Sequence, residues 1–482
     1  MSINEHVHSA DSEIPAGRVW PQEWLKSLPL RDGDRDDFLK AMESKAPSSV
    51  RVNAAKASFV GASDPVPWHP DAHYLAERPS YTFDPAFHAG AYYPQEASSM
   101  LVHALIRHLG LNEKPIQALD LCAAPGGKST LLRSALHPES FLLANEVVGK
   151  RLNLLEENLC KWGLSGYALS QADPSRFSAL PAFFDLILVD APCSGEGMFR
   201  KDSESVNHWS PSLVDICAER QARILDAIWP SLQPGGFLIY STCTFNRKEN
   251  EDGLSDFCRR SGAQCLQLDL PYPEWVQSEI EGGSALRAFP HRLRGEGFFV
   301  AVLQKEGGNK SGPPVRSKRG SKRFSTVRVD ALSSDMNYLT DGRGRLFAAR
   351  PSTVDTLYSI DKALGLITPG PLLGSLHKER FKPGHGLALM AEAIGQNTYN
   401  KVNVDHELAL KYLRREDIPA PANARGYLLV EYDGFHLGFA KAHRDRLISQ
   451  YPQNWRIRSQ NGCLPEALVS AIDFPKGESM PS

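Results

Sequence analysis

Between residues 116 and 303 the sequence alternates short apolar runs with longer amphipathic stretches, an arrangement that few folds can accommodate. Each run has the length of a buried strand, and the stretches between the runs have the apolar spacing of helices. Strands that alternate with helices build a parallel sheet with both faces covered. We therefore predict a doubly wound, Rossmann-like α/β fold. The expected strands are 116–121, 141–146, 167–173, 185–190, 237–241 and 297–303. One helix is expected to begin near 128, and two more are expected over 150–162 and 214–229.

The chain has 482 residues, which leaves room for several domains around this α/β region. From Lys305 to Arg328 it carries eight basic residues and one acid, Glu306, among many Gly, Ser and Pro residues. This segment is typical of a solvated flexible linker and of a basic strap for phosphates, and both interpretations stay open. The expected units are an N-terminal extension over 1–110, the α/β domain over 111–305, a basic linker over 306–329, a middle domain over 330–415 and a β-rich domain over 416–482.

Composition restricts the cell compartment and the metal chemistry. No run of about 18 apolar residues occurs, and the first residues lack the apolar core of a secretory signal. We therefore expect a cytoplasmic protein without a membrane partner. The eight cysteines include no C-x-x-C pair, and no His/Cys cluster has the spacing of a zinc site, so no metal is expected. The net charge of −2 does not by itself indicate a nucleic-acid binder.

A Gly-rich segment, DLCAAPGGK at 120–128, joins the first expected strand to the first helix. Such a turn lets the backbone approach a ligand closely, and the helix start presents free N–H groups. A phosphate-binding P-loop would need a glycine at Cys122, which disfavours an ATPase, whereas a tight turn without a ligand stays open. The candidate cofactor-binding residues here are Cys122, Ala123, Ala124, Pro125, Gly126, Gly127 and Lys128.

Acidic residues stand at the ends of the next three expected strands: Glu146, Asp173 and Asp190. In a doubly wound sheet the Glu146 position reaches the ribose hydroxyls of a nucleoside cofactor. Asp173 ends the third expected strand, where the amino group of an adenine could be met. Each acid alone is also typical of a turn. Together, above a Gly-rich loop, the three acids indicate a nucleoside cofactor at the carboxyl edge of the sheet.

Two thiols follow neighbouring strands of the expected sheet. Cys193 comes three residues after Asp190 in the sequence DAPCSG, and Cys243 follows the fifth strand in STCT. Pro192 fixes the backbone before Cys193. Because the fourth and fifth strands of a parallel sheet end at the same edge, we expect the two thiols to be neighbours. Each cysteine taken alone is more typical of a packed core residue.

Paired thiols beside a nucleoside cofactor suit one reaction in particular, the methylation of carbon 5 of cytosine. This carbon is a poor nucleophile until a thiolate adds to carbon 6. A carboxylate near N3 and the exocyclic amine stabilises the charge that develops. A second acid or base is then needed to remove the C5 proton and expel the thiol. The target base must also leave its stack.

These motifs resemble the Nol/Nop/Sun family of RNA (cytosine-5)-methyltransferases. The resemblance implies S-adenosylmethionine as cofactor, bound by Cys122 to Lys128, Glu146, Asp173 and Asp190. It also implies that Cys243 is the nucleophile that attacks carbon 6 and that Cys193 assists product release, with Asp190 facing both cofactor and target base. The matching segments are DLCAAPGGK at 120–128, DAPCSGEG at 190–197, STCTFNRKENE at 241–251, RVN at 51–53 and AYYPQEASSML at 91–101.

The C-terminal part is similar to the bacterial RsmF branch of that family. Residues 370–389 look like the middle domain of the branch, and 426–457 look like its PUA-type RNA-binding domain. This resemblance implies 16S ribosomal RNA or the small ribosomal subunit as partner, with 1–110 as an extension that binds RNA. Candidate RNA contacts in the last domain are Arg444, Arg446, Tyr451 and Trp455.

Three other functions stay open. The same chemistry could act on transfer RNA. A DNA cytosine methyltransferase would use Cys193, rather than Cys243, as its nucleophile. A non-catalytic RNA-binding assembly factor could keep the cofactor fold, although the presence of Asp190 and both cysteines disfavours it.

Overall fold

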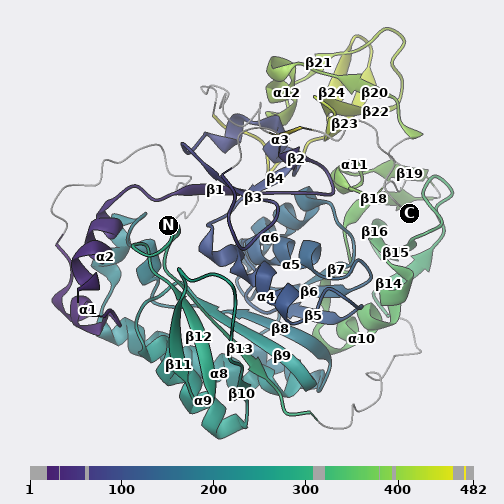
Figure 1. Ribbon diagram of the computed structural model, residues 1–482. Helices are drawn as coiled ribbons and strands as arrows, with labels where there is room; N and C mark the ends of the chain where they lie inside the picture. Colours follow the sequence, from purple (N-terminus) through teal and green to yellow (C-terminus); the bar gives the residue numbers. More distant parts are fainter. Residues whose placement is uncertain are drawn as a thin grey trace.

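A mixed sheet of ten strands forms the centre of the computed structural model, which describes residues 19–31, 33–59, 64–307, 321–378, 380–392, 398–459 and 472–473 (Figure 1). Its strand order is β11-β12-β13-β9-β8-β5-β6-β7-β17, with β10 paired to β13. The run β9-β8-β5-β6-β7 is parallel, and β13 is antiparallel to β9. The predicted doubly wound, Rossmann-like fold is confirmed. The strands are β5 Gln117–Asp120, β6 Phe141–Asn145, β7 Tyr167–Ser170, β8 Phe184–Asp190, β9 Leu232–Thr242, β10 Gln264–Cys265, β11 Val276–Ile280, β12 Gly283–Ala288 and β13 Phe298–Gln304.

Both faces of this sheet are covered by helices, because successive apolar side chains of the central strands point to opposite sides. Leu186 and Leu188 of β8 face one cluster, whereas Ile187 and Val189 face the other. Each fully buried aliphatic side chain contributes about 1.5–3 kcal/mol. The first face carries α4 Leu101–His108, α5 Gly127–Ala135 and α6 Gly149–Trp162, and the second carries α8 Pro211–Ile228, α9 Gly253–Ser261 and α10 Val354–Leu364.

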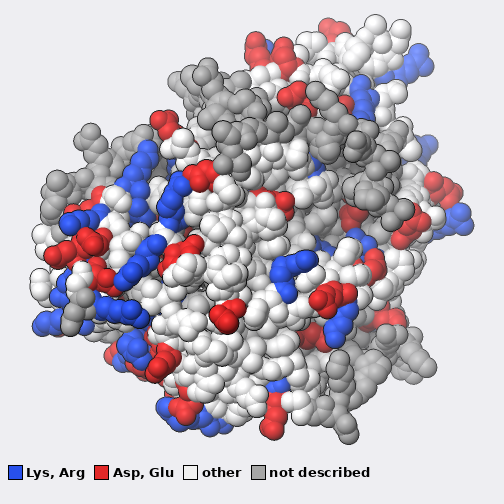
Figure 2. Space-filling model, in the orientation of Figure 1, with Lys and Arg blue, Asp and Glu red and all other residues white. Residues whose placement is uncertain are grey.

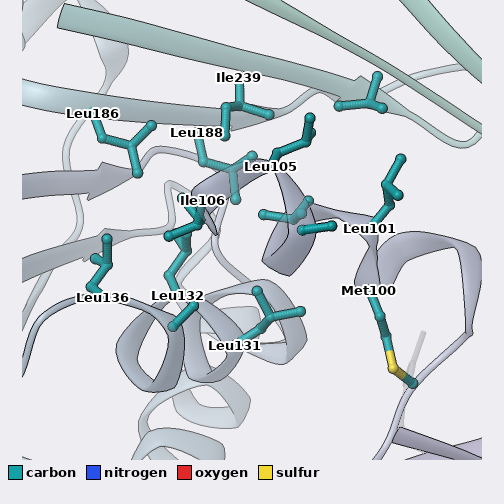
Figure 3. Close-up of a cluster of buried hydrophobic side chains, with 14 of the residues drawn as sticks. Met100, Leu101, Leu105, Ile106, Leu131, Leu132, Leu136, Leu186, Leu188 and Ile239 are labelled. Carbon is teal, nitrogen blue, oxygen red and sulfur yellow. The ribbon is translucent and has the colours of Figure 1, made fainter. Parts of the chain in front are cut away.

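The packing of α4 and α5 on the sheet fixes the start of α5, where the Gly-rich loop ends. Figure 3 shows Leu101, Leu105 and Ile106 of α4 beside Leu131 and Leu132 of α5, with side chains of β8 and β9 above them. All of these side chains are fully buried. The packed layer of α4 and α5 therefore holds the end of the Gly-rich loop in a fixed position on the sheet.

Two strands differ from the prediction. The third strand, β7, ends at Ser170, because Asp173 caps the short helix η3 (Pro174–Ala179) and accepts a hydrogen bond from the backbone N–H of Ser175. The fifth strand, β9, begins at Leu232 and includes the glycines expected to precede it. An irregularity in the register with β8 lies there, where Gly235 has a φ of +77°.

The N-terminal part places three short α-helices of the described residues and a small sheet beside the central domain. The sheet has the order β3-β1-β4, and the side chain of Arg51 on β1 is buried against the Gly-rich loop region. Its guanidinium donates to Gln95 Oε1 at 2.9 Å and to Thr130 Oγ1 at 2.6 Å, and lies 4.2 Å from the ring centroid of Trp162. The elements are α1 Gln22–Ser27, α2 Asp34–Glu43, β1 Ser48–Val52, β2 Ser58–Phe59, β3 Ala72–Leu75, α3 Pro85–His88 and β4 Tyr92–Pro94.

The part after the central domain forms two further sheets. The first has the order β14-β15-β16-β18-β19, and the second has the order β20-β22-β23-β24-β21. Most of the basic segment, 308–320, lies outside the described residues. The elements are β14 Phe324–Val327, β15 Asn337–Asp341, β16 Arg345–Ala349, β18 Leu372–His377, β19 Arg380–Pro383, α11 His385–Leu389, β20 Lys401–Asn403, α12 His406–Leu413, β21 Ile418–Pro419, β22 Tyr427–Tyr432, β23 Phe435–His443 and β24 Arg446–Ser449.

Several contacts tie these parts into one molecule. Strand β17 (Leu366–Thr368) leaves the middle region and pairs antiparallel with β7 at the edge of the central sheet. Strand β2 pairs with β25 (Ile472–Asp473), so distant parts of the chain meet. In Figure 1 the last sheet lies above α3 and β4. Within the described residues, no helix combines the length and the apolar character needed to cross a bilayer.

Candidate active site

The Gly-rich loop after β5 is held against α6 and the N-terminal sheet. Asn158 of α6 donates its side-chain amide to the Pro125 carbonyl at 2.8 Å, and Arg151 donates to the Ala124 carbonyl at 2.6 Å. A Cβ on Gly126 would lie 3.3 Å from Asn158, and one on Gly127 would lie 3.3 Å from the Tyr93 ring. Gly126 also has a φ of +114°, which disfavours other residues. These glycines therefore allow the loop to pass close to its neighbours.

Two buried carboxylates beside this loop each have an oxygen that accepts no hydrogen bond among the described residues, Asp120 Oδ1 and Glu146 Oε2, and the second of these lies 3.3 Å from Arg151 Nη1 in an ion pair. The other oxygen of Asp120 accepts from Ser129 Oγ at 2.6 Å, and the other oxygen of Glu146 accepts from the Val148 N–H at 2.9 Å. Burial raises the pKa of Asp120 to about 7. A buried acceptor without a donor is costly. Glu146 stands where ribose hydroxyls are bound in doubly wound sheets, so a nucleoside cofactor fits this edge.

Asn145, the last residue of β6, joins three strand ends and was missed in the sequence. Its amide donates to the carbonyls of Leu121 and Ala172, at 3.1 and 3.0 Å. Its Oδ1 accepts from the Ala172 N–H and from Ser170 Oγ. The side chain is fully buried. A polar residue that ends the apolar run before Glu146 is the only signal of this role in the sequence.

Asp173 lies at the same edge but is exposed, unlike Asp120 and Glu146. Its carboxylate accepts hydrogen bonds from the hydroxyl and the backbone N–H of Ser175, at 2.6 and 3.0 Å. These hydrogen bonds hold the pKa of Asp173 below its usual value. Its position after β7 leaves it accessible to the base of a nucleoside.

Asp190, at the end of β8, lies between a lysine and a serine. Its Oδ2 accepts from Lys128 Nζ at 2.9 Å, and its Oδ1 accepts from Ser241 Oγ at 2.8 Å. Burial works against the charge of Lys128, but the carboxylate of Asp190 outweighs it and raises the pKa of Lys128. The Cys243 sulfur adds to the same effect. The Gly-rich loop and the strand ends of β8 and β9 thus meet at one polar centre.

The thiols of Cys193 and Cys243 lie side by side, with their Sγ atoms 3.4 Å apart. Both side chains are partly buried. The hydrogen bond from Cys193 to Cys243, together with burial, raises the pKa of Cys193 well above its usual value. Cys193 therefore stays protonated at neutral pH, in direct contact with the second thiol.

A buried polar cluster connects the two thiol loops and was also missed in the sequence. Glu249 accepts from the Ser194 N–H at 3.0 Å, from Gln221 at 2.8 Å and from Asn246 at 2.7 Å. Asn246 in turn donates to Glu196 at 3.0 Å. Burial raises the pKa of Glu249. Because these residues come from three separate segments, only the folded chain shows that they support both thiols.

The two loops also touch through their backbones at Gly197. Its N–H donates to the Cys243 carbonyl at 2.7 Å. A Cβ at this position would lie 2.6 Å from the same carbonyl oxygen and 3.0 Å from the carbonyl of Gly297. Any larger residue would push the Cys243 loop away.

A Gly-rich loop, buried acids at the ends of β5 and β6, and an antiparallel strand beside the last parallel one define this chain as an S-adenosylmethionine-dependent methyltransferase. Three family models match it. These are the 16S rRNA methyltransferase RsmB/F over residues 108–304, the N-terminal domain of 16S rRNA methyltransferase RsmF over 21–97 and the methyltransferase RsmF PUA domain over 399–457.

Curated relatives cover most of the chain. Ribosomal RNA small subunit methyltransferase F of Escherichia coli O139:H28 is 32% identical over 458 residues, which are 87% of this chain and 92% of the relative. The protein of the same name from Shigella boydii serotype 18 is 31% identical over 456 residues, with the same coverage of both chains. The chain belongs to the ribosomal RNA small subunit methyltransferase F family. The crystal structure of PH0851 shares the fold, with a TM-score of 0.53 and 24% identity over 59% of this chain and 66% of that one.

Proposed function

We propose that this enzyme transfers a methyl group from S-adenosylmethionine to carbon 5 of a cytosine in 16S ribosomal RNA, through a covalent bond between Cys243 and carbon 6. The observation that carries the proposal is the distance of 3.4 Å between the sulfur atoms of Cys193 and Cys243. Two thiols side by side can supply the two functions that the reaction needs, a nucleophile and a proton donor. The residues around Asp120 and Glu146 would hold the cofactor.

The first half of the reaction makes the ring nucleophilic. The Cys243 sulfur bonds to carbon 6, and the electrons of the C5–C6 double bond move into the ring. N3 takes up a proton as the ring gains these electrons, and Asp190, held by Lys128 and Ser241, would accept hydrogen bonds from this N3–H and from the exocyclic amine. When bound, S-adenosylmethionine supplies the electrophilic methyl group that carbon 5 attacks.

The second half releases the product. The C5 proton leaves to a base, and its bonding electrons restore the C5–C6 double bond. The bond between carbon 6 and the Cys243 sulfur breaks, with its electron pair remaining on the sulfur. The Cys193 sulfur lies within hydrogen-bond distance of that sulfur, and its raised pKa keeps a proton available for the departing group. In this scheme Cys193 is the acid that ends the cycle.

The choice of 16S ribosomal RNA is supported by the relatives, which are named ribosomal RNA small subunit methyltransferase F. The match to an RsmF PUA domain over 399–457 supports RNA as partner, and a cytoplasmic location follows from such a substrate. We propose that the expected domains keep the roles given to them above. Residues 111–305 form the catalytic domain, and residues 1–110 and 416–482 bind RNA. Tyr451 is fully buried and is therefore excluded as an RNA contact. Arg444 and Arg446 are exposed and remain candidate RNA contacts of the last unit.

Trapping of the covalent adduct tests the proposal. Wild type, Cys193→Ala and Cys243→Ala are incubated with labelled S-adenosylmethionine and small-subunit RNA, transfer RNA or intact small subunits, then run on a denaturing gel. Cys193→Ala should accumulate a protein–RNA adduct because it cannot release product, and Cys243→Ala should form none. An adduct that persists in Cys243→Ala and disappears in Cys193→Ala would reverse the two roles. Methyl transfer to transfer RNA alone would refute the proposed substrate.

A further inference from the structure

A pocket of about 370 Å³ lies between the N-terminal part and the loop over 289–297 that joins β12 to β13. Every ionisable side chain in its lining is basic: Lys45, Arg200, His291, Arg292 and Arg294. Three of them, Lys45, Arg292 and Arg294, are exposed at the surface. In Figure 2, Lys and Arg side chains interleaved with acids gather on the left of the face shown, the side where Figure 1 places α1 and α2. We call the pocket lined by these five basic residues the arginine pocket.

The walls of the arginine pocket are fixed to each other by Arg200, which is buried. Its guanidinium donates to the Ser44 and Lys45 carbonyls on the N-terminal side, at 3.1 and 2.9 Å. It also donates to the Gly295 carbonyl on the opposite side, at 3.1 Å. The pocket is therefore formed before any ligand arrives.

The same walls continue into both thiol loops. Arg200 is in the segment that follows Cys193, directly after η4 (Glu196–Met198). Phe289, at the start of the other wall, stacks on Phe245 with a centroid distance of 5.8 Å, and Phe245 is two residues after Cys243. Both walls of the arginine pocket are thus connected to the loops that carry the thiols.

The cations of the pocket can accept a new anion. Arg292 and Arg294 each use one guanidinium nitrogen on an acid outside the lining, Asp34 and Asp64 respectively. Exposed ion pairs of this kind contribute little, and each guanidinium has further donors. His291 adds no charge of its own, because burial lowers its pKa and its Nε2 lies 3.8 Å from Asp34 Oδ2. Planar guanidinium groups match the geometry of phosphate.

We infer that the arginine pocket binds backbone phosphates of the RNA strand next to the target cytosine, an inference that rests on the proposed function. Phosphate contacts of this kind position a nucleic acid without reading its sequence. The pocket thus fixes the strand so that the cytosine turned out of its stack meets Cys243.

The test compares Arg292→Gln/Arg294→Gln with the control Arg259→Gln/Arg260→Gln, which alters two equally exposed, ion-paired arginines of α9. Binding of a 16S RNA fragment is measured over a series of salt concentrations. The pocket variant should bind roughly tenfold or more weakly, and its slope of log K against log salt should fall by about 1.4, because two phosphate contacts are lost. The control should match wild type.

Equal affinity and equal salt slope in the pocket variant and the control would overturn the inference. Thermal unfolding and S-adenosylmethionine binding show that the variant folds; if it does not, Arg294→Gln, whose side chain is 57% exposed, takes its place with the same expected direction. A wild type that binds RNA but methylates no cytosine would refute the proposed function while the binding comparison still decides the inference. A wild type that methylates, with variants that match the control, refutes the inference alone.

Discussion

The carboxyl group of Asp120 links the cofactor site to the stability of the protein. In the folded chain without cofactor, burial raises its pKa from 3.8 to about 7. Between these values the unfolded chain loses the proton while the folded chain keeps it, so stability falls as pH rises, by up to about 1.4 kcal/mol per pH unit. Asp120→Asn should remove this fall. Urea unfolding of the cofactor-free protein from about pH 5 to about pH 7 measures it.

Asp173→Asn is the matched control for this experiment. Its carboxylate is exposed, and hydrogen bonds from Ser175 lower its pKa, so it is ionised in both states throughout that pH range. The control should keep the wild-type slope. A wild-type slope in Asp120→Asn as well would show that another group causes the pH dependence.

At the scale of single residues, the site residues that could be predicted from the sequence are those that stand together in short motifs. The Gly-rich loop and the two cysteines stand in short motifs, and the expected approach of Cys193 to Cys243 followed from the order of two strands. Asn145, Asn246 and Glu249 were missed because their partners come from other segments of the chain. An isolated Asn or Glu in the sequence does not reveal which loops it will join.

Among the helices, α1 and α2 support the Cys243 loop from outside the central domain. Phe38 of α2 is fully buried and meets the ring of Phe245 edge-on, at 5.1 Å between centroids. Trp24 of α1 and Phe199 belong to the same cluster. The cluster therefore connects the N-terminal helices to both thiol loops.

Phe38→Ala should remove this support. Loss of a buried phenyl ring costs about 3–5 kcal/mol, and the Cys243 loop should lose its fixed position. We expect a lower midpoint of thermal unfolding and a lower rate of adduct formation, with S-adenosylmethionine affinity retained. Leu39→Ala, at a partly buried neighbour, should have a smaller effect on all three quantities. Equal adduct rates in Phe38→Ala and wild type would show that the helices do not act on the nucleophile.

At the scale of elements, the long apolar strands were predictable, and the short ones were not. The runs that became β6 and β8 are strongly apolar. Strand β17 has three residues and β2 has two, and each pairs with a segment far away in the sequence. Such strands exist because of their partners, and no local pattern marks them.

On the scale of the whole molecule, the first and last sheets share one core. Val50 and Tyr92 of the N-terminal sheet belong to the same buried cluster as Tyr412 and Tyr451 of the C-terminal unit. The Tyr451 hydroxyl forms a hydrogen bond of 3.0 Å with His88 Nδ1. The C-terminal unit is therefore packed against the N-terminal sheet and is not joined to the rest of the chain by a linker alone.

Tyr451→Ala should loosen both units together. The cavity should cost about 3–5 kcal/mol by analogy with other large aromatic side chains. Hydrogen exchange should accelerate in β1 and β4 as well as in β22 and β23, while β5 and β6 keep their protection. Tyr451→Phe, which loses only the hydrogen bond to His88, should have a smaller effect. Faster exchange in β22 and β23 alone would show that the units open independently.

This shared core has a consequence during synthesis. The N-terminal half of the cluster leaves the ribosome about 320 residues before Tyr412, and at about 5–20 residues per second this delay is on the order of tens of seconds. For that time the N-terminal residues of the cluster lack their partners from the C-terminal unit. The nascent protein must therefore expose these apolar side chains until the C-terminal unit has been translated, so a pause or a premature stop before Tyr412 would leave the N-terminal part prone to aggregation.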